Sequence, residues 1–450
     1  MTRLRLLGGA GSLLLTGGAW ALWVRPSAVA LGAGVAGLGL VVLAWVLLAR
    51  AAPSPGWAGR TVAVWTAPLL VAPPLFSRDA WSYLAQGALA AGGADPHRVG
   101  PAGGLPPDSA VLARVDGHWR DAPSPYGPVT DLVQRGIAAV AGDGPVAGIA
   151  AYRLLAVVAV VALGWAVVAM ARRAGAPEGT ALLLAAGNPL VLFHLVGGVH
   201  NDALMLAPML CGVAVALRGA DRGSRPATVL GVVLVTAGAL VKIPAAAALV
   251  VLAVELGRRR GPLPAAVLVA GPAVVTGALV SAITGTSWLW SMTTPGQVGS
   301  WMAPTNWPGF AAGLADPALV EPGIALGRTA GLAAAAVAVV VVLVGQWRGR
   351  WDAVTALGLV LGAVVVAGPV VQPWYLLWAA TPLLVAVPSR LRGALVGVVA
   401  VFAVLLPPLA GDLSGDVPGA ITAYVVAAAA VLAVALLVRR TGYAALVRPA

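Results

Sequence analysis

Long apolar runs recur along the whole 450-residue chain, and they constrain its fold more than any other feature. Most of them are about 17–22 residues long, the length of a helix that crosses the hydrocarbon core of a bilayer. A segment inside lipid must satisfy its backbone hydrogen bonds internally, so helix is the expected conformation. The runs are continuous rather than alternating, which argues against a transmembrane β-barrel. The sequence therefore predicts an all-α polytopic membrane protein.

The composition agrees with this class and excludes two others. The chain is 60% hydrophobic and only 10% charged, whereas about a quarter of the residues in a soluble domain are charged. The net charge of +12 comes from short basic clusters between apolar runs, a membrane-topology signal, so we predict no nucleic-acid partner. The single cysteine, Cys211, excludes a disulfide within the chain and a cysteine-based metal site. The first run follows Arg3 and Arg5, and we interpret it as an uncleaved span rather than a signal peptide.

We predict about fourteen transmembrane spans in a single integral membrane domain, residues 1–450. They lie at roughly residues 6–24, 28–49, 61–75, 147–171, 180–197, 200–217, 226–241, 243–257, 262–283, 326–346, 353–371, 373–388, 393–410 and 419–438. With the N-terminus in the cytoplasm, every inner turn is basic, as the positive-inside rule requires. Two long segments, about 76–145 and 284–325, then face the outside.

The first outer segment concentrates the polar chemistry of the chain. It carries seven of the sixteen acidic residues and two of the four histidines. Residues 80–91 are expected to form a short helix on the membrane surface, with Trp81, Leu84, Ala88 and Leu89 along one side. The part from Asp95 to Pro128 is rich in proline and glycine and is expected to be an ordered loop.

Asp79, the first acidic residue of the chain, directly follows an apolar run. A carboxylate at this boundary is costly to hold and usually functional. It is suited to accept a proton from a sugar hydroxyl, which is a poor nucleophile near neutral pH. Arg78 beside it would keep the carboxylate ionised or bind phosphate. The alternative is a solvated Arg–Asp pair at a helix end.

Further polar motifs occupy the same predicted side. Tyr126 lies in the turn Pro123–Pro128, whose aromatic neighbours are suited to stack on sugar rings, unless this is only a rigid packed loop. Asp95 precedes Pro96 and His97 in a similar loop, where His97 is interpreted as a loop histidine rather than a metal ligand. His200, Asn201 and Asp202 follow Gly197 and Gly198 and offer several donors and acceptors for sugar hydroxyls. Capping of a helix by Asn201 or Asp202 is the alternative.

Lys242 is the only lysine among 28 basic residues and stands in an apolar stretch at a predicted outer helix end. An ammonium there needs an anion, and a lipid phosphate would provide one. Arg153, on the same predicted side, invites the same interpretation. Snorkelling of either side chain to lipid headgroups is the alternative.

Aromatic residues also gather on the outer side, including Trp374 and Tyr375. An interfacial aromatic belt explains some of them, but Asn306 and Gln372 add polar groups that a belt does not need. No P-loop and no Asp-x-Asp pair is present in the sequence. A donor used outside the cell, away from nucleotide sugars, is therefore expected to be lipid-linked.

Together these motifs resemble the polyprenol-phosphomannose-dependent α-1,6-mannosyltransferases of actinobacteria, the MptA/MptB type. The resemblance rests on motifs that occur in the same order over most of the chain: Phe76–Tyr83, Gln86-Gly87, Asp95-Pro96, Pro125–Pro128, Asn188-Pro189, His200–Asp202 and Gln372–Tyr375. His97 stands where the family pattern has a tyrosine after Asp-Pro.

The resemblance implies a GT-C glycosyltransferase with its active site at the outer face of the plasma membrane. It implies Asp79 as the catalytic base, polyprenyl-phosphate mannose as donor and a lipid-linked mannan as acceptor, as in lipomannan and lipoarabinomannan assembly. We expect Lys242, Arg78 and Arg153 to meet the donor phosphate, with no metal and no cofactor. The residues expected to bind sugar or acceptor are Tyr83, Asp95, Tyr126, His200, Asn201, Asp202, Asn306, Gln372, Trp374 and Tyr375.

Two alternatives stay open at this stage. One is a GT-C enzyme that transfers another polyprenyl-linked sugar. The other is a polyprenyl-lipid transporter or flippase, although such proteins bury ionisable groups near the middle of the bilayer and often show paired repeats. Here the charges lie at predicted helix ends, and we see no repeat.

Overall fold

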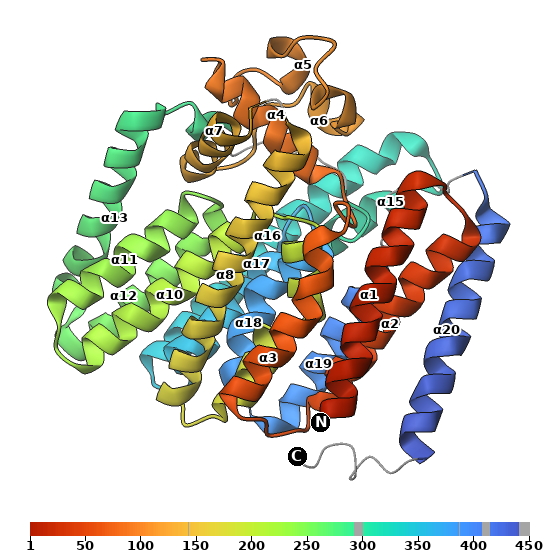
Figure 1. Cartoon of the computed structure of the whole chain (residues 1–450). Coiled ribbons are helices and arrows are strands. Elements are labelled where there is room, and N and C mark those ends of the chain that lie inside the picture. Colours follow the sequence, from red (N-terminus) through yellow and green to blue (C-terminus); the bar gives the residue numbers. More distant parts are fainter. Residues whose placement is uncertain (143, 292–299, 387, 407–414, 441–450) are drawn as a thin grey trace. The chain divides into compact units, whose positions relative to one another are not determined.

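The computed structural model describes residues 1–142, 144–291, 300–386, 388–406 and 415–440. Within these ranges, all regular secondary structure is helical, which confirms the predicted class (Figure 1). Seven of the described helices are long and apolar enough to cross a membrane. They are α1 (Thr2–Val24), α2 (Ala28–Leu48), α8 (Pro145–Arg173), α10 (Asp202–Asp221), α13 (Pro262–Thr284), α16 (Val320–Trp347) and α20 (Val417–Arg440).

The other predicted spans coincide with shorter helices. These are α3 (Pro55–Thr66), α9 (Glu178–Ala185), α11 (Arg225–Ala239), α12 (Ala247–Arg260), α17 (Ala353–Ala367), α18 (Leu376–Ala386) and α19 (Ser389–Leu405). The last four residues of the span predicted at 393–410 lie outside the described ranges. The protein is thus a polytopic membrane protein, and the count of fourteen spans stays a prediction.

The span predicted at residues 180–197 is interrupted in the structure. Helix α9 ends at Ala185, and a π-helical segment, η3 (Val191–Gly197), follows. Pro189 explains the break, because it has no N–H group to continue the helix and it disfavours helical backbone at Asn188. The Asn188 side chain accepts a hydrogen bond from the Leu190 N–H (2.9 Å), which stabilises the turn.

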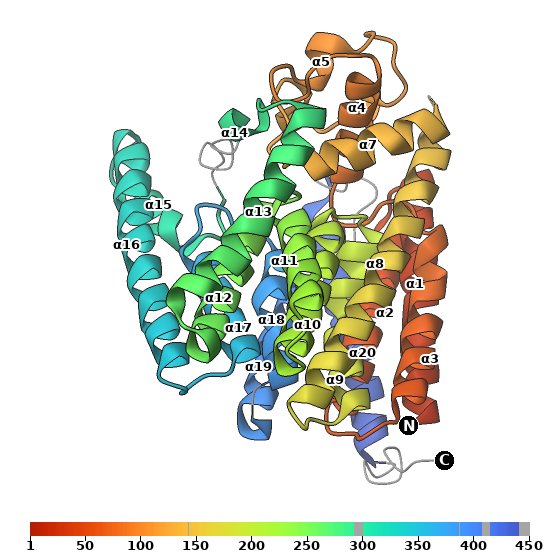
Figure 2. The same cartoon turned by 90° about the vertical axis from the view of Figure 1, so that its left-hand side faces the viewer.

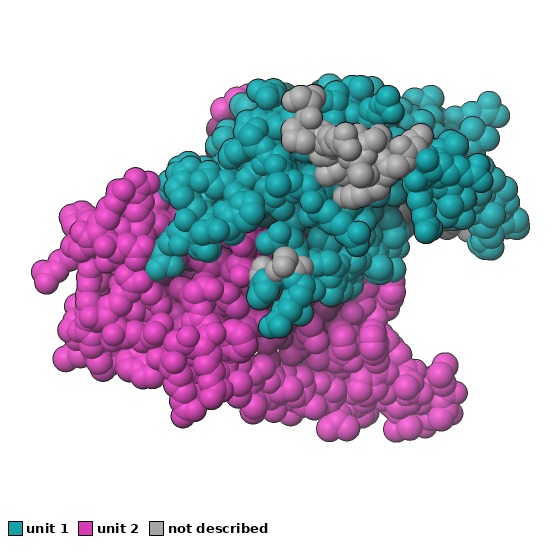
Figure 3. Space-filling view, turned by 90° about the horizontal axis from the view of Figure 1, so that it is seen from below, with its two compact units in different colours: residues 1–81, 145–200, 387–450 teal, residues 82–144, 201–386 magenta. Residues whose placement is uncertain are grey.

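The chain forms two compact units, coloured separately in Figure 3. Unit 1 consists of residues 1–81, 145–200 and 387–450, and unit 2 consists of residues 82–144 and 201–386. In unit 1, α1 and α2 approach so closely that a Cβ on Gly18 would lie 2.5 Å from the Gly34 nitrogen. Small residues at such contacts allow close packing of helices in membranes. Helix α20 packs on α2 in the same unit.

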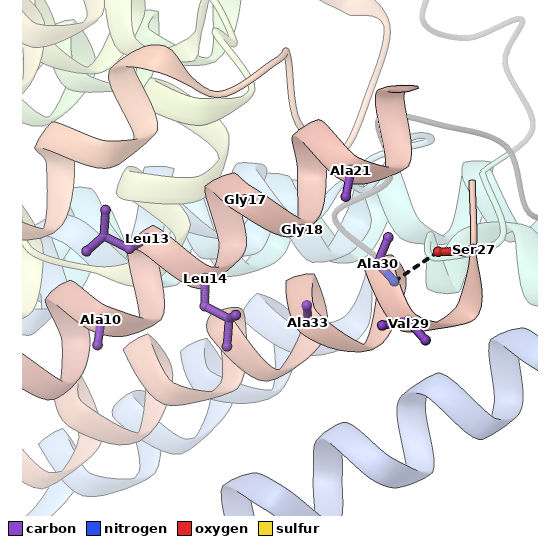
Figure 4. Close-up of a pocket in the computed structure, with 10 residues that line it drawn as sticks. All are labelled: Ala10, Leu13, Leu14, Gly17, Gly18, Ala21, Ser27, Val29, Ala30 and Ala33. Carbon is purple, nitrogen blue, oxygen red and sulfur yellow. Dashed lines mark hydrogen bonds between the residues drawn. The ribbon is translucent and has the colours of Figure 1, made fainter. Parts of the chain in front are cut away.

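A shallow groove of about 640 Å³ lies over α1 and α2 (Figure 4). Its lining is almost entirely aliphatic, and its one hydroxyl, on Ser27, accepts a hydrogen bond from the Ala30 N–H. None of the residues that the sequence predicts for the site lines this groove.

Four short helices follow one another in the segment predicted to face the outside: α4 (Asp79–Ala91, which begins in unit 1 and continues in unit 2), α5 (Pro101–Gly104), α6 (Gly117–Arg120) and α7 (Pro128–Ala141). Figures 1 and 2 both place α5 beyond the upper end of α13, and α7 contacts α13. The long helices α13 and α16 bury only 6% and 11% of their apolar windows in protein, as expected of faces that meet lipid.

Helix α4 forms where the sequence predicts it, but it is not a one-sided surface helix. Trp81, Leu84 and Leu89 are buried, and so are Tyr83 and Gln86 on its other sides. The reason is tertiary: the Gln134 amide of α7 donates to Gln86 Oε1 (3.1 Å), and Tyr83 packs edge-on against Tyr126. The expectation of a helix with a single apolar stripe was therefore wrong.

Candidate active site

Asp79 is the first residue of α4 and stands directly after a tight turn of unit 1. A carboxylate in the first turn of a helix is favoured by the helix dipole. The turn is formed by a hydrogen bond from the Ser77 N–H to the Leu75 carbonyl (2.8 Å) across Phe76. Phe76 has a φ of 67°, which matches the rare and strained form of the γ-turn.

A second strained residue stands before His200, also in unit 1. Val199 has a φ of 59°, and Phe76 and Val199 are the two non-glycine residues with positive φ in the described chain. Val is β-branched, so left-handed backbone is unusual for it. Each such residue costs about 1–3 kcal/mol, and such strain gathers at functional sites. The two turns are joined, because the Leu75 N–H donates to the Gly197 carbonyl (3.1 Å) and the Phe76 ring contacts His194.

These turns bring three polar side chains together, which we call the turn cluster: Ser77, Asp79 and His200. The Asp79 N–H donates to Ser77 Oγ (3.2 Å), and Ser77 Oγ lies 3.3 Å from His200 Nε2. His200 Nδ1 lies 3.4 Å from Asp79 Oδ2. The His200 side chain is fully buried, whereas that of Asp79 is 19% exposed. Among the described residues, none makes a hydrogen bond or ion pair with Asp79 Oδ1. Asp79 Oδ2 thus faces His200 Nδ1 at a distance longer than a good hydrogen bond, and the carboxylate stays partly exposed.

The two arginines of unit 1 that were predicted to bind phosphate differ in their surroundings. The Arg153 guanidinium is buried and donates to the carbonyl oxygens of Leu70 (2.9 Å) and Gly197 (3.4 Å). It therefore braces the turn that carries His200. Arg78 is exposed, and within the described ranges its guanidinium has no hydrogen-bond or ion-pair partner.

A second set of predicted residues gathers in unit 2, which we call the acid–aromatic cluster: Asp202, Lys242, Tyr375 and Trp378. The buried Asp202 carboxylate accepts from the Trp378 indole N–H (2.7 Å) and from Lys242 Nζ, 3.2 Å from both oxygens. Lys242 Nζ also lies 4.0 Å from the centroid of the Tyr375 ring and 5.0 Å from that of Trp378. These are cation–π distances.

The Asp202 carboxylate is an anion next to Lys242, as the sequence analysis required. The ammonium is paired with Asp202 inside the chain, and this pairing raises the pKa of Lys242 even though burial opposes it. Since a buried carboxylate and a buried ammonium compensate each other, the assignment of Lys242 to a lipid phosphate stays a prediction. The Tyr375 ring stacks on Trp378 with centroids 4.4 Å apart, and the Trp374 ring meets Tyr375 edge-on.

Asn201 occupies the N-cap position of α10, as one of the two interpretations predicted, but its side chain makes no capping bond. The residue is 3% exposed. In the described part of the chain, neither its amide oxygen nor its amide nitrogen has a hydrogen-bond partner. A buried amide without partners is costly, so the role of Asn201 as a sugar-binding residue stays a prediction.

The loop that carries Tyr126 is tied to the residues just before Lys242. The N–H groups of Gly127 and Val129 donate to the carbonyls of Val241 and Leu240, both at 3.0 Å. Gly127 is required here, because a Cβ would lie 2.1 Å from the Leu240 oxygen. Unit 2 thus brings Tyr126, which was predicted to bind sugar, near Lys242, which was predicted to bind the donor phosphate.

Asp95 and His97 stabilise the loop that carries Tyr126. Asp95 Oδ1 accepts from the His97 N–H (2.9 Å) and closes its own turn. The His97 side chain is buried, with Nδ1 3.1 Å from the Ser124 carbonyl and Nε2 2.5 Å from Asp131 Oδ2. His97 is a loop histidine with protein partners, and we call His97 and Asp131 the loop pair.

Asn306 and Gln372 lie near two connections of unit 2. The Asn306 amide donates to the carbonyls of Ser300 (2.8 Å) and Pro369 (3.1 Å) and accepts from Arg328 Nε (2.9 Å). These bonds occupy the whole amide, so Asn306 acts first as a brace. Gln372 is half-buried and precedes η8 (Pro373–Tyr375), which carries Trp374 and Tyr375.

Sequence reasoning missed several residues of these clusters. Trp378 stands three residues after Tyr375, a helical spacing that could have revealed it. Arg328 is a lone cation inside an apolar span, which is itself a signal of function or structural pairing. Ser77 and Asp131 carry no comparable signal, because their partners lie 123 and 34 residues away in the sequence.

Comparison with known proteins places these clusters in a family. The model for an α-(1→6)-mannopyranosyltransferase N-terminal domain of the MptA/MptB family matches residues 6–258, which include the turn cluster. The model for an MptB C-terminal domain matches residues 305–438, which include Tyr375 and Trp378. No solved structure matches the chain.

Individual relatives agree with the family models. The chain is 34% identical to a probable α-(1→6)-mannopyranosyltransferase of Mycolicibacterium smegmatis, over 98% of this chain and 89% of the relative. It is 32% identical to an α-(1→6)-mannopyranosyltransferase of Mycobacterium tuberculosis, over 85% and 78% of the two chains. It is 35% identical to α-(1→6)-mannopyranosyltransferase B of Corynebacterium glutamicum, over 77% and 64%.

Proposed function

The chain belongs to the MptA/MptB family of α-(1→6)-mannopyranosyltransferases, and we propose that its donor is polyprenyl-phosphate mannose and its acceptor a lipid-linked mannan. It is a mannosyltransferase and a multi-pass membrane protein. The proposed role is in lipomannan and lipoarabinomannan assembly. The observation that carries the proposal is the turn cluster, in which Asp79 Oδ2 faces His200 Nδ1 at 3.4 Å and the carboxylate stays partly exposed.

The proposed reaction is a single displacement with inversion at the anomeric carbon. Asp79 Oδ1 accepts the proton of an acceptor hydroxyl, and the acceptor oxygen forms a bond to the anomeric carbon of mannose. The bond between this carbon and the phosphate oxygen breaks, and polyprenyl phosphate leaves with the electron pair. Asp79 thereby takes the role of general base, in agreement with its exposure and its place at a helix start.

The leaving phosphate needs a cation, and charge pairing favours Arg78 among the three candidates. Lys242 is paired with Asp202, and Arg153 donates to two backbone carbonyls. Arg78 is exposed, adjacent to Asp79 in the chain, and without a guanidinium partner in the described ranges. We therefore propose that Arg78 meets the phosphate first, while Arg153 and Lys242 hold the surrounding chain. No metal is required in this scheme.

In unit 2, Asn201 and the aromatic side chains are proposed as residues that bind sugar or acceptor. Asn201 offers an unpaired donor and acceptor for hydroxyl groups. Tyr375 is half-buried, and its contacts with Lys242 and Trp378 fix the orientation of its ring. Tyr83, Tyr126, Trp374, Gln372 and Asp202 are proposed to shape this region, with Asp95 and Asn306 as braces.

The active site is proposed to face the outside of the plasma membrane. Support comes from the basic clusters at the ends that would be cytoplasmic, such as Arg172 and Arg173 at the end of α8 and Arg258–Arg260 at the end of α12. Nucleotide sugars are absent from that side, which favours a donor carried by a lipid.

One assay tests the proposal. Purified protein in lipid nanodiscs receives labelled polyprenyl-phosphate mannose and a synthetic α-mannoside acceptor, and the product is analysed for its linkage. We expect α-1,6-linked product without added metal and none from GDP-mannose. The Asp79→Asn variant should fold and give no transfer. Transfer only from another polyprenyl-linked sugar, or movement of the lipid across the bilayer without transfer, would reject the proposal.

A further inference from the structure

The turn cluster suggests a role for His200 that differs from sugar binding. We propose that His200 is a positioning residue, which fixes the orientation of the Asp79 carboxylate through Nδ1 and is itself oriented by Ser77. This inference rests on the proposed role of Asp79 as the base. It changes the expected assignment of His200, which the sequence placed among the sugar-binding residues.

Burial argues against direct contact between His200 and a sugar. The His200 side chain has 0% exposed surface, whereas the Asp79 side chain is 19% exposed. The ring packs near His194, with centroids 5.9 Å apart, and its two nitrogens face Ser77 and Asp79. Because both ring nitrogens of His200 face protein groups, His200 acts on a substrate through its neighbours, and the accessible neighbour here is Asp79.

One tautomer of neutral His200 suits every partner. A carboxylate only accepts hydrogen bonds, so Nδ1 must carry the proton on the side of Asp79 Oδ2. Nε2 is then an acceptor and accepts a hydrogen bond from the Ser77 hydroxyl, while Ser77 Oγ accepts from the Asp79 N–H. His200 Nδ1 and Asp79 Oδ2 lie 3.4 Å apart without meeting hydrogen-bond geometry in this structure, so we propose that the cycle of donors and acceptors closes in the reacting complex. The distances of 3.3 and 3.4 Å are long, as is common without substrate, and should shorten in the reacting complex.

The proposed contact between His200 Nδ1 and Asp79 Oδ2 explains why Asp79 Oδ1 is the oxygen that reacts. With Oδ2 directed at His200, rotation of the carboxylate is restricted and Oδ1 is left for the acceptor hydroxyl. After proton transfer to Oδ1, Oδ2 is the carbonyl oxygen of the acid and still accepts from Nδ1. The contact therefore persists through the reaction, and His200 neither gains nor loses a proton.

The strained backbone supports the same assignment. Phe76 and Val199 directly precede Ser77 and His200, and both have left-handed φ values of 67° and 59°. Loss of either conformation would turn Ser77 or His200 away from Asp79. Strain retained at the residues before both partners indicates that their mutual placement is the feature maintained.

The test compares His200→Ala, His200→Asn and Ser77→Ala in the nanodisc assay, with acceptor and donor titrated separately. In asparagine the amide nitrogen is attached to Cγ, as Nδ1 is in histidine, so His200→Asn retains a donor for Oδ2. We expect His200→Ala to lower kcat by about 10²-fold with both KM values within about threefold. His200→Asn should recover about tenfold of this loss, and Ser77→Ala should lower kcat by about fivefold.

His118→Ala is the matched control. His118 also contacts an aspartate, with Nδ1 3.1 Å from Asp116 Oδ1, but its side chain is 90% exposed. We expect unchanged kcat and KM for this variant. Folding of each variant is checked by size-exclusion chromatography and thermal unfolding, and His200→Asn with Ser77→Ala keep the test valid if His200→Ala does not fold.

Two results would overturn the inference. A raised acceptor KM with unchanged kcat in His200→Ala or His200→Asn would make His200 a binding residue. Equal activity of His200→Asn and His200→Ala would show that the Nδ1 contact is not the operative one. Full activity of Asp79→Asn is a different outcome, because it removes the base assignment of the proposed function itself.

Discussion

The protein contains two buried histidines that contact aspartates in opposite ways. In the loop pair of unit 2, His97 Nε2 lies 2.5 Å from Asp131 and Nδ1 lies 3.1 Å from the Ser124 carbonyl. In the turn cluster of unit 1, His200 lies 3.4 Å from Asp79. Asp131 Oδ1 is buried without a hydrogen-bond partner in the described ranges, whereas Asp79 is partly exposed. The first pair is closed, and the second leaves a carboxylate oxygen for a reactant.

The proton count makes the difference clear. A carbonyl oxygen only accepts, so His97 Nδ1 must carry a proton to bond to Ser124. The short contact between Nε2 and Asp131 then requires one more proton, shared between the ring and the carboxyl group. Burial lowers the pKa of His97, but the hydrogen bond and charge of Asp131 outweigh it, and the pKa is raised. Burial also raises the pKa of Asp131. The pair titrates as a unit that retains its proton.

The largest expected effect is a difference in kcat between two variants, in which the aspartate of either histidine–aspartate pair is replaced by asparagine. Asp79→Asn removes the proton acceptor and should lower kcat by about 10²–10⁴-fold with the protein still folded. Asp131→Asn should lower kcat by less than about twofold, because the asparagine amide can donate to neutral His97 Nε2 and the loop keeps its bonds. The nanodisc assay with purified variants measures both.

Amounts of folded protein from size-exclusion chromatography serve as the control for this comparison. The contrast between the two pairs would be broken by a loss of kcat in Asp131→Asn as large as that in Asp79→Asn. It would also be broken by nearly full activity of Asp79→Asn.

The sequence was most informative where one local rule dominates. Apolar length located the helices, because a span in lipid has few alternatives. The cost of a charge next to an apolar run singled out Asp79 and Lys242. The same rule required an anion for Lys242 but could not name Asp202, which lies 40 residues earlier and reaches it through tertiary packing.

The geometry of the two histidine–aspartate pairs could not be predicted from local sequence patterns. Left-handed backbone is usually signalled by glycine, and Phe76 and Val199 give no such signal. The partner of His97 is carried by α7 and reaches it only when the Pro-rich loop folds back. Helix α4 was expected to expose one side, and the contacts of Gln86 and Tyr83 with α7 and Tyr126 enclosed it.

A smaller effect is expected from a change that touches no reacting group. A Cβ on Gly198 would lie 2.9 Å from the carbonyl oxygens of His194 and Leu75 and 3.0 Å from the His200 ring. Gly198→Ala should therefore shift the turn and lower kcat by about tenfold. Gly136→Ala in α7 is the matched control, because no atom lies within 4 Å of its added Cβ. It should leave kcat unchanged and stabilise the helix by up to about 1 kcal/mol.

Equal kcat for Gly198→Ala and wild type would mean that the turn adapts without moving His200. The turn cluster would then be no more rigid than the loop that carries the loop pair. A loss of kcat in Gly136→Ala of the same size would point to a general effect of added bulk.

The smallest expected effect is a dependence of folding stability on pH, which we expect from the loop pair and not from the turn cluster. The folded pKa of His97 lies above its ordinary value of 6.5, so above pH 6.5 the folded protein binds more protons than the unfolded chain. The stability contributed by the loop pair is then present below about pH 6.5 and is lost as pH rises through the raised pKa. The raised pKa of Asp131 acts in the same direction.

Unfolding by denaturant in mixed micelles, measured between pH 6 and pH 9, should show this loss in the wild-type protein. The slope cannot exceed about 1.4 kcal/mol per pH unit for one proton. In Asp131→Asn the partner that raises the pKa of His97 is gone, so the slope should become flatter, while Asp79→Asn should keep the wild-type slope. A wild-type slope that survives in Asp131→Asn would assign the proton to another group and leave the loop pair as an ordinary hydrogen bond.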